Sequence, residues 1–242
     1  AHGIVITGGA GNLGTYTITD TAAALADASF TKGVGSKAAA SVTVLVGSNS
    51  QDLTAIDLDS DVTAINLNDK TNVVLDMGNI GARTISTGTG GNGTYLVRDI
   101  ATNLTNITLA PAAASVTAVM AANDYDLSAV TLDTDVTNID LNGKTGITMD
   151  AGNAHSRVVT KNDGTYTISD TAAALADASF NAGGGSDTAE SVTAVIADNS
   201  QDITGVTFDS TVTNINLNDK TNVVMDAANA HGIVITGGAG NL

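Results

Sequence analysis

The chain has 242 residues, with 25 acidic and 9 basic side chains and a formal net charge of −16 at pH 7. This charge argues against a nucleic-acid partner, because a phosphate-binding surface needs clustered Lys and Arg. No apolar run reaches the roughly 18 residues that a membrane-spanning helix needs, so we expect no membrane insertion. Trp and Cys are absent and aromatic residues make up only 3% of the chain, so the core must be built from aliphatic side chains.

Internal repetition is the main feature of the sequence. The segment GTYTITDTAAALADASF at 14–30 returns almost unchanged at 164–180, and Lys70, Lys144 and Lys220 stand at equivalent positions, 74 and 76 residues apart. We expect one continuous array. Its parts are repeat 1 (1–80), repeat 2 (81–153), repeat 3 (154–229) and the start of a fourth repeat (230–242), which is identical to 1–13. This identity indicates a longer parent array.

The first part of each repeat predicts a strand followed by a short helix. TYTIT at 15–19 alternates between polar and larger side chains, as a half-buried strand does. The alanine-rich segment Thr21–Phe30 favours a helix, and Asp20 is expected to be its N-cap. Asp170 precedes the same sequence in repeat 3, where we expect the same helix.

The second part of each repeat predicts a series of short strands. In repeat 1 these are SVTVLV, LTAIDL, VTAINL and NVVLD, which are rich in β-branched residues. Ile56, Ile65 and Val74 follow one another at nine-residue intervals, which indicates strand-plus-turn modules. Equivalent strands of the three repeats are then expected to stack in parallel along one face: 62–67, 136–141 and 212–217.

These patterns predict an all-β fold, a parallel β-solenoid of the β-helix or β-roll type, with one short helix per repeat of about 76 residues. A string of tandem immunoglobulin-like β-sandwiches is the alternative, since about seven strands fit into one repeat. The absence of Trp, the scarcity of aromatic residues and the lack of linkers between repeats favour the solenoid.

One short motif carries a resemblance to a known class of proteins. The pattern Y-x-I-x-D-T-A-A-x-L-A, present as Tyr16–Ala26 and Tyr166–Ala176, resembles repeats of very large bacterial secreted proteins, the RTX-like adhesins and S-layer-like surface proteins. The resemblance implies an extracellular or cell-surface location and a role in adhesion, matrix or surface-layer building. The chain departs from these proteins in one respect, because GGAGNL at 8–13 has the glycines of the calcium nonapeptide G-G-x-G-x-D without its aspartate.

Aspartates in predicted turns are the candidate calcium ligands, because one turn can offer several carboxylate oxygens. The candidates are Asp57, Asp59 and Asp61 in repeat 1, Asp133 and Asp135 in repeat 2, and Asp209 in repeat 3. Only the middle aspartate recurs in all three repeats, and turn residues that bond their own backbone are the simpler interpretation. We therefore expect that no cofactor is required and that folding depends little on calcium.

Asparagines also recur at the predicted strand ends, and two interpretations of them stay open. They could form hydrogen-bonded ladders between stacked coils, or they could make a polar outward face. The positions are Asn66 and Asn216, then Asn68, Asn142 and Asn218, and then Asn79, Asn153 and Asn229.

Signals for catalysis are weak. ITGGAGNLG at 6–14 is similar to a dinucleotide-binding loop, but the strand TYTIT follows it where that loop needs a helix. His2, His155 and His231 occur one per repeat head, which indicates neither a catalytic triad nor a metal site. We expect a protein that is not an enzyme, and a carbohydrate-acting β-helix enzyme is the least favoured alternative.

The sequence thus predicts an extracellular structural repeat protein that builds a cell-surface fibre, sheath or S-layer. Neither end of the chain has the polar cap that protects a solenoid, so we expect head-to-tail association of the chain with its own copies. The non-catalytic stalk of a bacterial adhesin is the alternative function. A surface polysaccharide is a further candidate partner.

Overall fold

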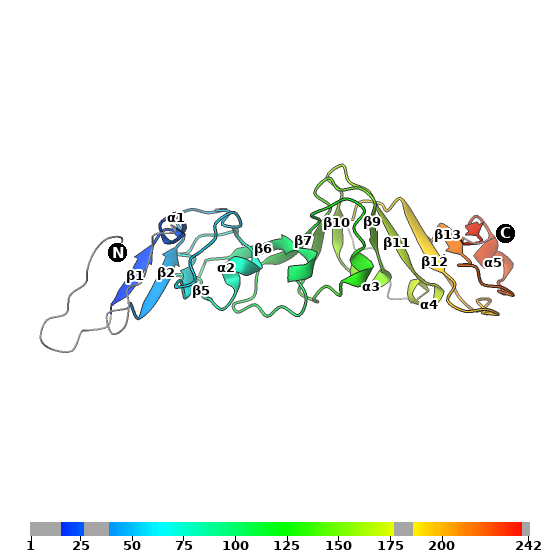
Figure 1. Cartoon of the computed structure of the whole chain (residues 1–242), viewed down its shortest axis with the longest axis horizontal. Coiled ribbons are helices and arrows are strands. Elements are labelled where there is room, and N and C mark those ends of the chain that lie inside the picture. The colour runs from blue at the N-terminus through cyan, green and yellow to red at the C-terminus, as the bar shows by residue number, and fades with distance from the viewer. Residues whose placement is uncertain (1–15, 27–38, 177–185, 239–242) are drawn as a thin grey trace, which may run out of the picture. The chain divides into compact units, whose positions relative to one another are not determined.

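The computed structural model describes residues 16–26, 39–176 and 186–238. This part of the chain is mostly β, with three parallel sheets and a few short helices (Figure 1). The predicted all-β class is therefore confirmed, and the sandwich alternative is wrong, because sandwiches are built from antiparallel sheets. Two compact units are present, residues 1–99 with 107–116 and residues 100–106 with 117–242.

The first unit contains a four-stranded sheet with the order β1-β2-β3-β5 and a second pairing, of β4 with β6 (Figure 1). The four-stranded sheet consists of β1 (Thr17–Asp20), β2 (Ser41–Leu45), β3 (Ala64–Asn66) and β5 (Thr84–Ser86). The other pair consists of β4 (Val73–Leu75) and β6 (Tyr95–Ile100).

In the second unit, β8 pairs with both β7 and β10, and a five-stranded sheet has the order β14-β13-β12-β11-β9. The first group consists of β7 (Ser115–Val119), β8 (Asn138–Asp140) and β10 (Val158–Thr160). The five-stranded sheet consists of β9 (Ile147–Met149), β11 (Tyr166–Thr171), β12 (Ser191–Val195), β13 (Asn214–Asn216) and β14 (Val234–Thr236).

Paired strands lie close together in the sequence, and this corrects the predicted stacking. Partner residues are 19 to 24 positions apart, as in the pairs Ile147 with Tyr166 and Thr167 with Ser191. The chain therefore returns to the same sheet several times within one repeat. A sheet is built from successive strands of a repeat and not from equivalent strands of different repeats. The equivalent strands β8 and β13 lie in different sheets, so the prediction that 136–141 and 212–217 share one face is wrong.

The nine-residue rhythm has a different meaning from the predicted one. Ile65 lies in β3 and Val74 in β4, and these strands belong to different sheets of the first unit. Nine residues is thus the distance from one sheet to the next along the chain. Ile56 lies outside the described strands.

The core of each unit follows from strict alternation along the strands. In β2, Val42 and Val44 have no exposed surface, whereas their neighbours are half-buried. The same pattern in β12 buries Ala194. Burying one aliphatic side chain of this kind contributes about 1.5–3 kcal/mol. Among the described residues, the largest side chains in the core are nevertheless Tyr95 and Tyr166, each 1% exposed.

The predicted helix exists but is shorter than expected, and its cap lies one residue later. Helix α1 (Ala22–Leu25) has Thr21 as its N-cap, with the Thr21 hydroxyl accepting from the Ala24 N–H at 3.4 Å. Asp20 instead accepts from the Thr21 N–H at 2.7 Å. Helix α4 (Ala172–Leu175) repeats this arrangement with Thr171 as N-cap, and the 3-10 helix η2 (Ala101–Asn103) takes the same place in repeat 2. Residues 27–30 lie outside the described part.

A second helical turn in each repeat was not predicted. These turns are α2 (Met77–Ile80), α3 (Ala151–Ala154) and α5 (Ala227–Ala230). Each follows an aspartate N-cap, Asp76, Asp150 or Asp226, whose Oδ1 accepts from the N–H of the asparagine three residues later. One further 3-10 turn is η3 (Leu127–Ala129).

The glycines of the repeat heads allow close approach of neighbouring turns. Gly88 has φ of +103°, and a side chain there would collide with the backbone nitrogen of Asp69. Gly238 has φ of +98° and approaches Asp219 in the same way. This second copy of the GGAG sequence is therefore a turn packed on its neighbour up to Gly238, and the copy at 6–14 lies outside the described residues.

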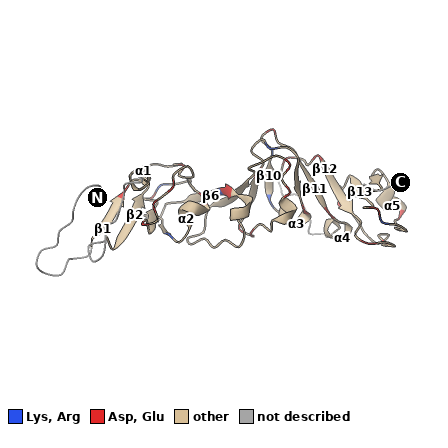
Figure 2. Cartoon of the chain, in the orientation of Figure 1, with Lys and Arg blue, Asp and Glu red and all other residues tan. Residues whose placement is uncertain are grey.

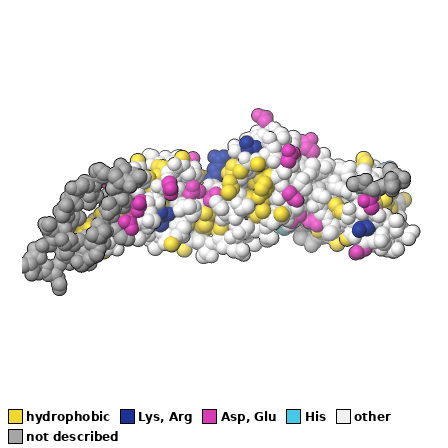
Figure 3. Space-filling view, viewed as in Figure 1, with side chains coloured by type: hydrophobic (Ala, Val, Ile, Leu, Met, Phe, Trp, Pro, Cys, Tyr) yellow, Lys and Arg dark blue, Asp and Glu magenta, His cyan; other side chains and the backbone are white. Residues whose placement is uncertain are grey.

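Acidic side chains are spread over both units and outnumber basic ones (Figure 2). Figure 3 shows the same on one face, where magenta carboxylates lie among neutral side chains. Within the described ranges, no helix is long and apolar enough to cross a membrane.

Candidate functional site

Among the described side chains of the second unit, a buried arginine is the most extensively hydrogen-bonded. Arg157 precedes β10 and is only 8% exposed. Its guanidinium donates to five backbone carbonyl oxygens, and we call such a set of carbonyls an arginine cradle. Nε donates to Val136 at 3.0 Å, Nη1 to Gly152 at 2.7 Å and Asn153 at 3.1 Å, and Nη2 to Leu132 at 3.3 Å and Asp133 at 3.0 Å.

The first unit contains the same arrangement around Arg83, which precedes β5. Nε donates to Val62 at 3.1 Å, Nη1 to Gly78 at 2.7 Å and Asn79 at 3.1 Å, and Nη2 to Leu58 at 2.9 Å and Asp59 at 3.1 Å. All five carbonyls stand at positions equivalent to those around Arg157. The cradle is therefore a recurring element of the repeat.

Short helices explain why these carbonyls are available. The last carbonyls of a helix have no partner within it, and a helix of four residues leaves most of its carbonyls in this state. Gly152 and Asn153 lie in α3, and their oxygens accept from Arg157. A cation at this end also interacts favourably with the helix dipole. The arginine thus joins the helical turn to the preceding turn of the chain.

In the cradle, burial and the nearby carboxylates shift the pKa of Arg157 in opposite directions. Burial lowers the pKa of the Arg157 guanidinium, and the carboxylates of Asp150 and Asp133 oppose this shift. Burial raises the pKa of the Asp150 carboxyl, against the hydrogen bond that it accepts from the Asn153 N–H, and the charge of Asp170 adds to the rise. An arginine side chain stays charged under these conditions, so the cradle holds a cation.

The third set of recurring asparagines connects successive turns, so neither open interpretation is correct for it. Asn79, Asn153 and Asn229 are 2%, 4% and 5% exposed. Their Nδ2 groups donate to backbone carbonyls of earlier turns: Leu53 at 2.8 Å, Leu127 at 2.9 Å and Ile203 at 2.8 Å. These side chains therefore form no ladder with one another and no outward face.

The other asparagines act mainly on the local backbone. Asn66 Oδ1 accepts from the Asn68 N–H at 2.8 Å, and Asn216 does the same for Asn218. Asn68, at φ of +52°, also donates through Nδ2 to the Val46 carbonyl at 3.3 Å. The first two bonds lie within a tight turn, and the bond to Val46 connects such a turn to an earlier part of the chain.

The candidate calcium ligands lie in turns. Asp59 Oδ1 accepts from the Asp61 N–H at 2.7 Å, and Asp133 Oδ1 accepts from the Asp135 N–H at 2.9 Å. Asp209 Oδ1 accepts from both the backbone N–H and the hydroxyl of Thr211, at 2.8 and 2.7 Å. These are side chains that bond their own backbone two residues on, as in Asx turns.

No three His, Cys, Asp or Glu side chains in the described ranges are grouped closely enough to hold a metal ion. Asp57 is instead one of the carboxylates near Arg83, and it opposes the lowering of the Arg83 pKa by burial. Calcium binding by any of the six aspartates stays a prediction.

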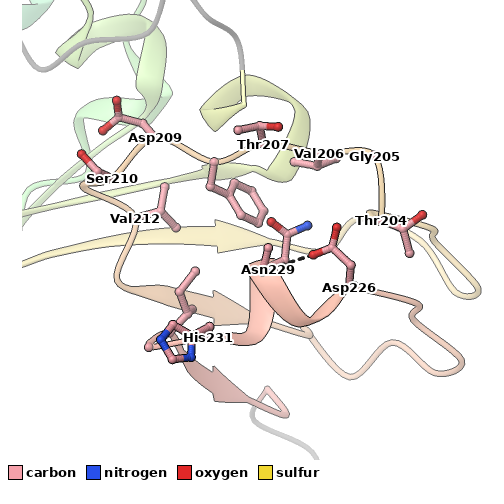
Figure 4. Close-up of a pocket in the computed structure, with 14 residues that line it drawn as sticks. Thr204, Gly205, Val206, Thr207, Asp209, Ser210, Val212, Asp226, Asn229 and His231 are labelled. Carbon is pink, nitrogen blue, oxygen red and sulfur yellow. Dashed lines mark hydrogen bonds between the residues drawn. The ribbon is translucent and has the colours of Figure 1, made fainter.

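Repeat 3 has a cradle without its arginine. Ile233, at the start of the fourth repeat, stands where Arg83 and Arg157 stand at the starts of repeats 2 and 3. A cavity of about 400 Å³ lies beside it, and its lining includes Phe208, Asp209, Val212 and Asn229 (Figure 4). Those positions are equivalent to four of the residues that accept from Arg157.

Sequence reasoning missed the cradles because their ligands are backbone atoms. The available signal was the recurrence of Arg83 and Arg157 four residues after Asn79 and Asn153, in a chain with few basic residues. Of the histidines, His155 contacts the Ser156 hydroxyl through Nε2 at 3.0 Å, and His2 lies outside the described residues. Compared with protein-family models, curated proteins and solved structures, the chain matches none.

Proposed function

We propose that the chain is a parallel β-solenoid and serves as a non-catalytic, extracellular structural protein. In this proposal it builds a cell-surface fibre, sheath or S-layer by head-to-tail association of its copies. The parallel pairing of strands 19 to 24 residues apart supports the solenoid, because each return of the chain then adds one coil. The cradles and buried asparagines support a structural role, since these side chains donate hydrogen bonds to backbone carbonyls of earlier turns.

The observation that carries the proposal is a pair of complementary strand edges. In the middle of the array, β9 pairs with β11, with Thr148 opposite Thr167. Val224 is the equivalent of Thr148 in the next repeat, and Thr17 is the equivalent of Thr167 in repeat 1. Val224 bridges Asp202 on one side, and β1, which contains Thr17, pairs with β2. We infer that β1 of a second copy adds to the edge at 223–225 in the register of β9 and β11.

Side-chain exposure supports the same contact. Val224 is 51% exposed, and Val234 and Ile235 in β14 are 59% and 42% exposed. By contrast, Val159, which is equivalent to Ile235, is 1% exposed, and its carbonyl accepts from the N–H of Asp187, further along the same repeat, at 2.8 Å. Exposed apolar strand edges of this kind favour pairing with a further strand. A contact between two different edges does not close on itself, so it propagates into a filament.

Sedimentation over a roughly hundredfold range of protein concentration tests the proposal. We expect linear oligomers that grow with concentration, and deletion of 230–242 should suppress them because it removes β14. The variant Val224→Lys places a charge on the proposed contact and should abolish the oligomers while leaving the fold intact, since this side chain is exposed. Ala121→Lys is the matched control, because it adds the same charge at an exposed turn and should assemble normally.

Two outcomes would contradict self-assembly through this contact. One is a chain that stays monomeric at every concentration, which would favour the adhesin stalk, since a stalk has no need to self-associate. The other is equal oligomer formation by Val224→Lys and Ala121→Lys, which would place the contact elsewhere.

A further inference from the structure

The cavity beside Ile233 has the same backbone as a cradle that binds a guanidinium in the two other repeats. Around Arg157 the five accepting carbonyls belong to residues 132, 133, 136, 152 and 153. Their equivalents in repeat 3 are 208, 209, 212, 228 and 229, and all five residues line the cavity. Ile233 supplies an alkyl side chain that cannot donate a hydrogen bond.

Three of these carbonyl oxygens have no partner among the described residues, namely those of Phe208, Val212 and Asn229. The other two accept only long or local backbone bonds, from the His231 N–H to Ala228 at 3.4 Å and from the Val212 N–H to Asp209 at 3.0 Å. Carbonyls held in this geometry form a ready set of acceptors, because the fold has already fixed their positions.

Negative charge at the cavity is kept although the arginine is lost. Asp226 and Asp209 line it, and they are equivalent to Asp150 and Asp133, whose carboxylates stabilise the charged form of Arg157. Figure 4 shows Asp226 held by its bond with Asn229 at one side of the cavity and Asp209 at the other. Two carboxylates and five carbonyls favour a cation with several donors.

We propose that the cradle of repeat 3 binds a guanidinium group supplied from outside this site, either by a small guanidinium compound or by an arginine of a second copy. A guanidinium suits the cradle better than an ammonium ion does, because its five N–H donors lie in one plane and match the five acceptors that Arg157 uses. The Phe208 ring in the lining adds a surface on which a planar cation can stack. The cavity volume of about 400 Å³ also suits a small molecule.

The first test fills the cradle from within the chain. Ile233→Arg introduces the residue that stands at the equivalent positions 83 and 157, and we expect the melting temperature to rise by roughly 2–4 °C. Ile233→Met is the control, with a long side chain but no donor, and should leave the melting temperature unchanged. A melting temperature of Ile233→Arg that is equal to or below that of Ile233→Met would show that the carbonyls do not form an arginine cradle, and would overturn the proposal.

The second test adds the ligand from solution and has a readout independent of self-association. Butylguanidinium is titrated while the backbone amide resonances of 208–212 and 228–233 are followed by NMR, with butylurea and butylammonium at equal concentration as controls. We expect saturable shifts at these amides with butylguanidinium alone, and their loss in Ile233→Arg. Equal shifts with all three compounds, or shifts that persist in Ile233→Arg, would overturn the site.

The two sources of the guanidinium give different results. Arg98 is the one arginine of the chain that is exposed and outside a cradle. If a second copy supplies the group, Arg98→Met should weaken self-association and butylguanidinium should compete with assembly. If a free compound is the ligand, Arg98→Met should assemble normally while butylguanidinium still binds. Failure of binding in both arms rejects the guanidinium site and leaves the strand-edge contact at Val224 standing.

Discussion

Replacing Arg157 by isoleucine converts a filled cradle into the form that repeat 3 carries. The change removes five charge-assisted donors and leaves their carbonyls inside a site that is only 8% exposed. A hydrogen bond to a charged group contributes about 1.5–3 kcal/mol. Five such values do not add, because the arginine also loses its hydration on folding and water can reach the outer carbonyls.

The expected cost of Arg157→Ile is therefore about 3–5 kcal/mol, the range for removing one partner from a buried charged network. Arg83→Ile should cost less, about 1–3 kcal/mol, because Arg83 is only half-buried and water can replace part of its bonds. Arg98→Ile is the comparison, since Arg98 is exposed on β6 and lies outside a cradle, and it should cost less than about 1 kcal/mol.

Urea unfolding followed by circular dichroism measures these differences. Arg83 and Arg157 lie in different compact units, so each variant should shift the transition of its own unit. A cost below about 1 kcal/mol for Arg157→Ile, similar to that of the Arg98 variant, would refute the reasoning. The carbonyls would then be satisfied without the arginine, and the cradle would have no energetic role.

Three other predictions concern single groups. Burial raises the pKa of Tyr166 to about 12. The stability that its neutral phenol contributes is therefore present below pH 10.0 and is lost as the pH rises toward about 12. Tyr166→Phe should remove this part of the alkaline destabilisation when melting temperatures are measured across this pH range. Thr171→Ala should lower stability by about 1 kcal/mol, because it removes the bond that the Ala174 N–H donates to the N-cap at 3.2 Å, and an unchanged urea midpoint would contradict this. Millimolar calcium should raise the melting temperature no more than sodium at equal ionic strength, since Asp59 and Asp209 already bond their own turns; a clearly larger rise with calcium would restore a metal site.

The sequence predicted the positions of several strands correctly, but not which strands pair with one another. Alternation along SVTVL and SVTAV placed β2, β7 and β12 correctly, because alternation reports which side chains face the core. It does not report which strand lies alongside. β8 and β13 are nearly identical in sequence yet belong to different sheets, since the pairing depends on how many residues each turn needs before the chain returns.

Local chemistry explains the remaining differences. The helical turns after Asp76 and Asp150 are too short for a helical periodicity to be visible, and only the aspartate cap with asparagine three residues later marks them. Asn153 was expected at a surface or in a ladder, but its amide bonds a buried carbonyl of another turn. Sequence patterns indicate which side chains are polar, whereas the backbone partners of those side chains depend on the fold.

Electron microscopy of the purified chain at high concentration tests the central claim most directly. If copies join through β1 and the edge at 223–225, the images should show unbranched threads one molecule wide, and Val224→Lys should give only single particles. Isolated particles of the unmodified chain at every concentration, or threads that Val224→Lys forms equally well, would contradict the proposed head-to-tail assembly.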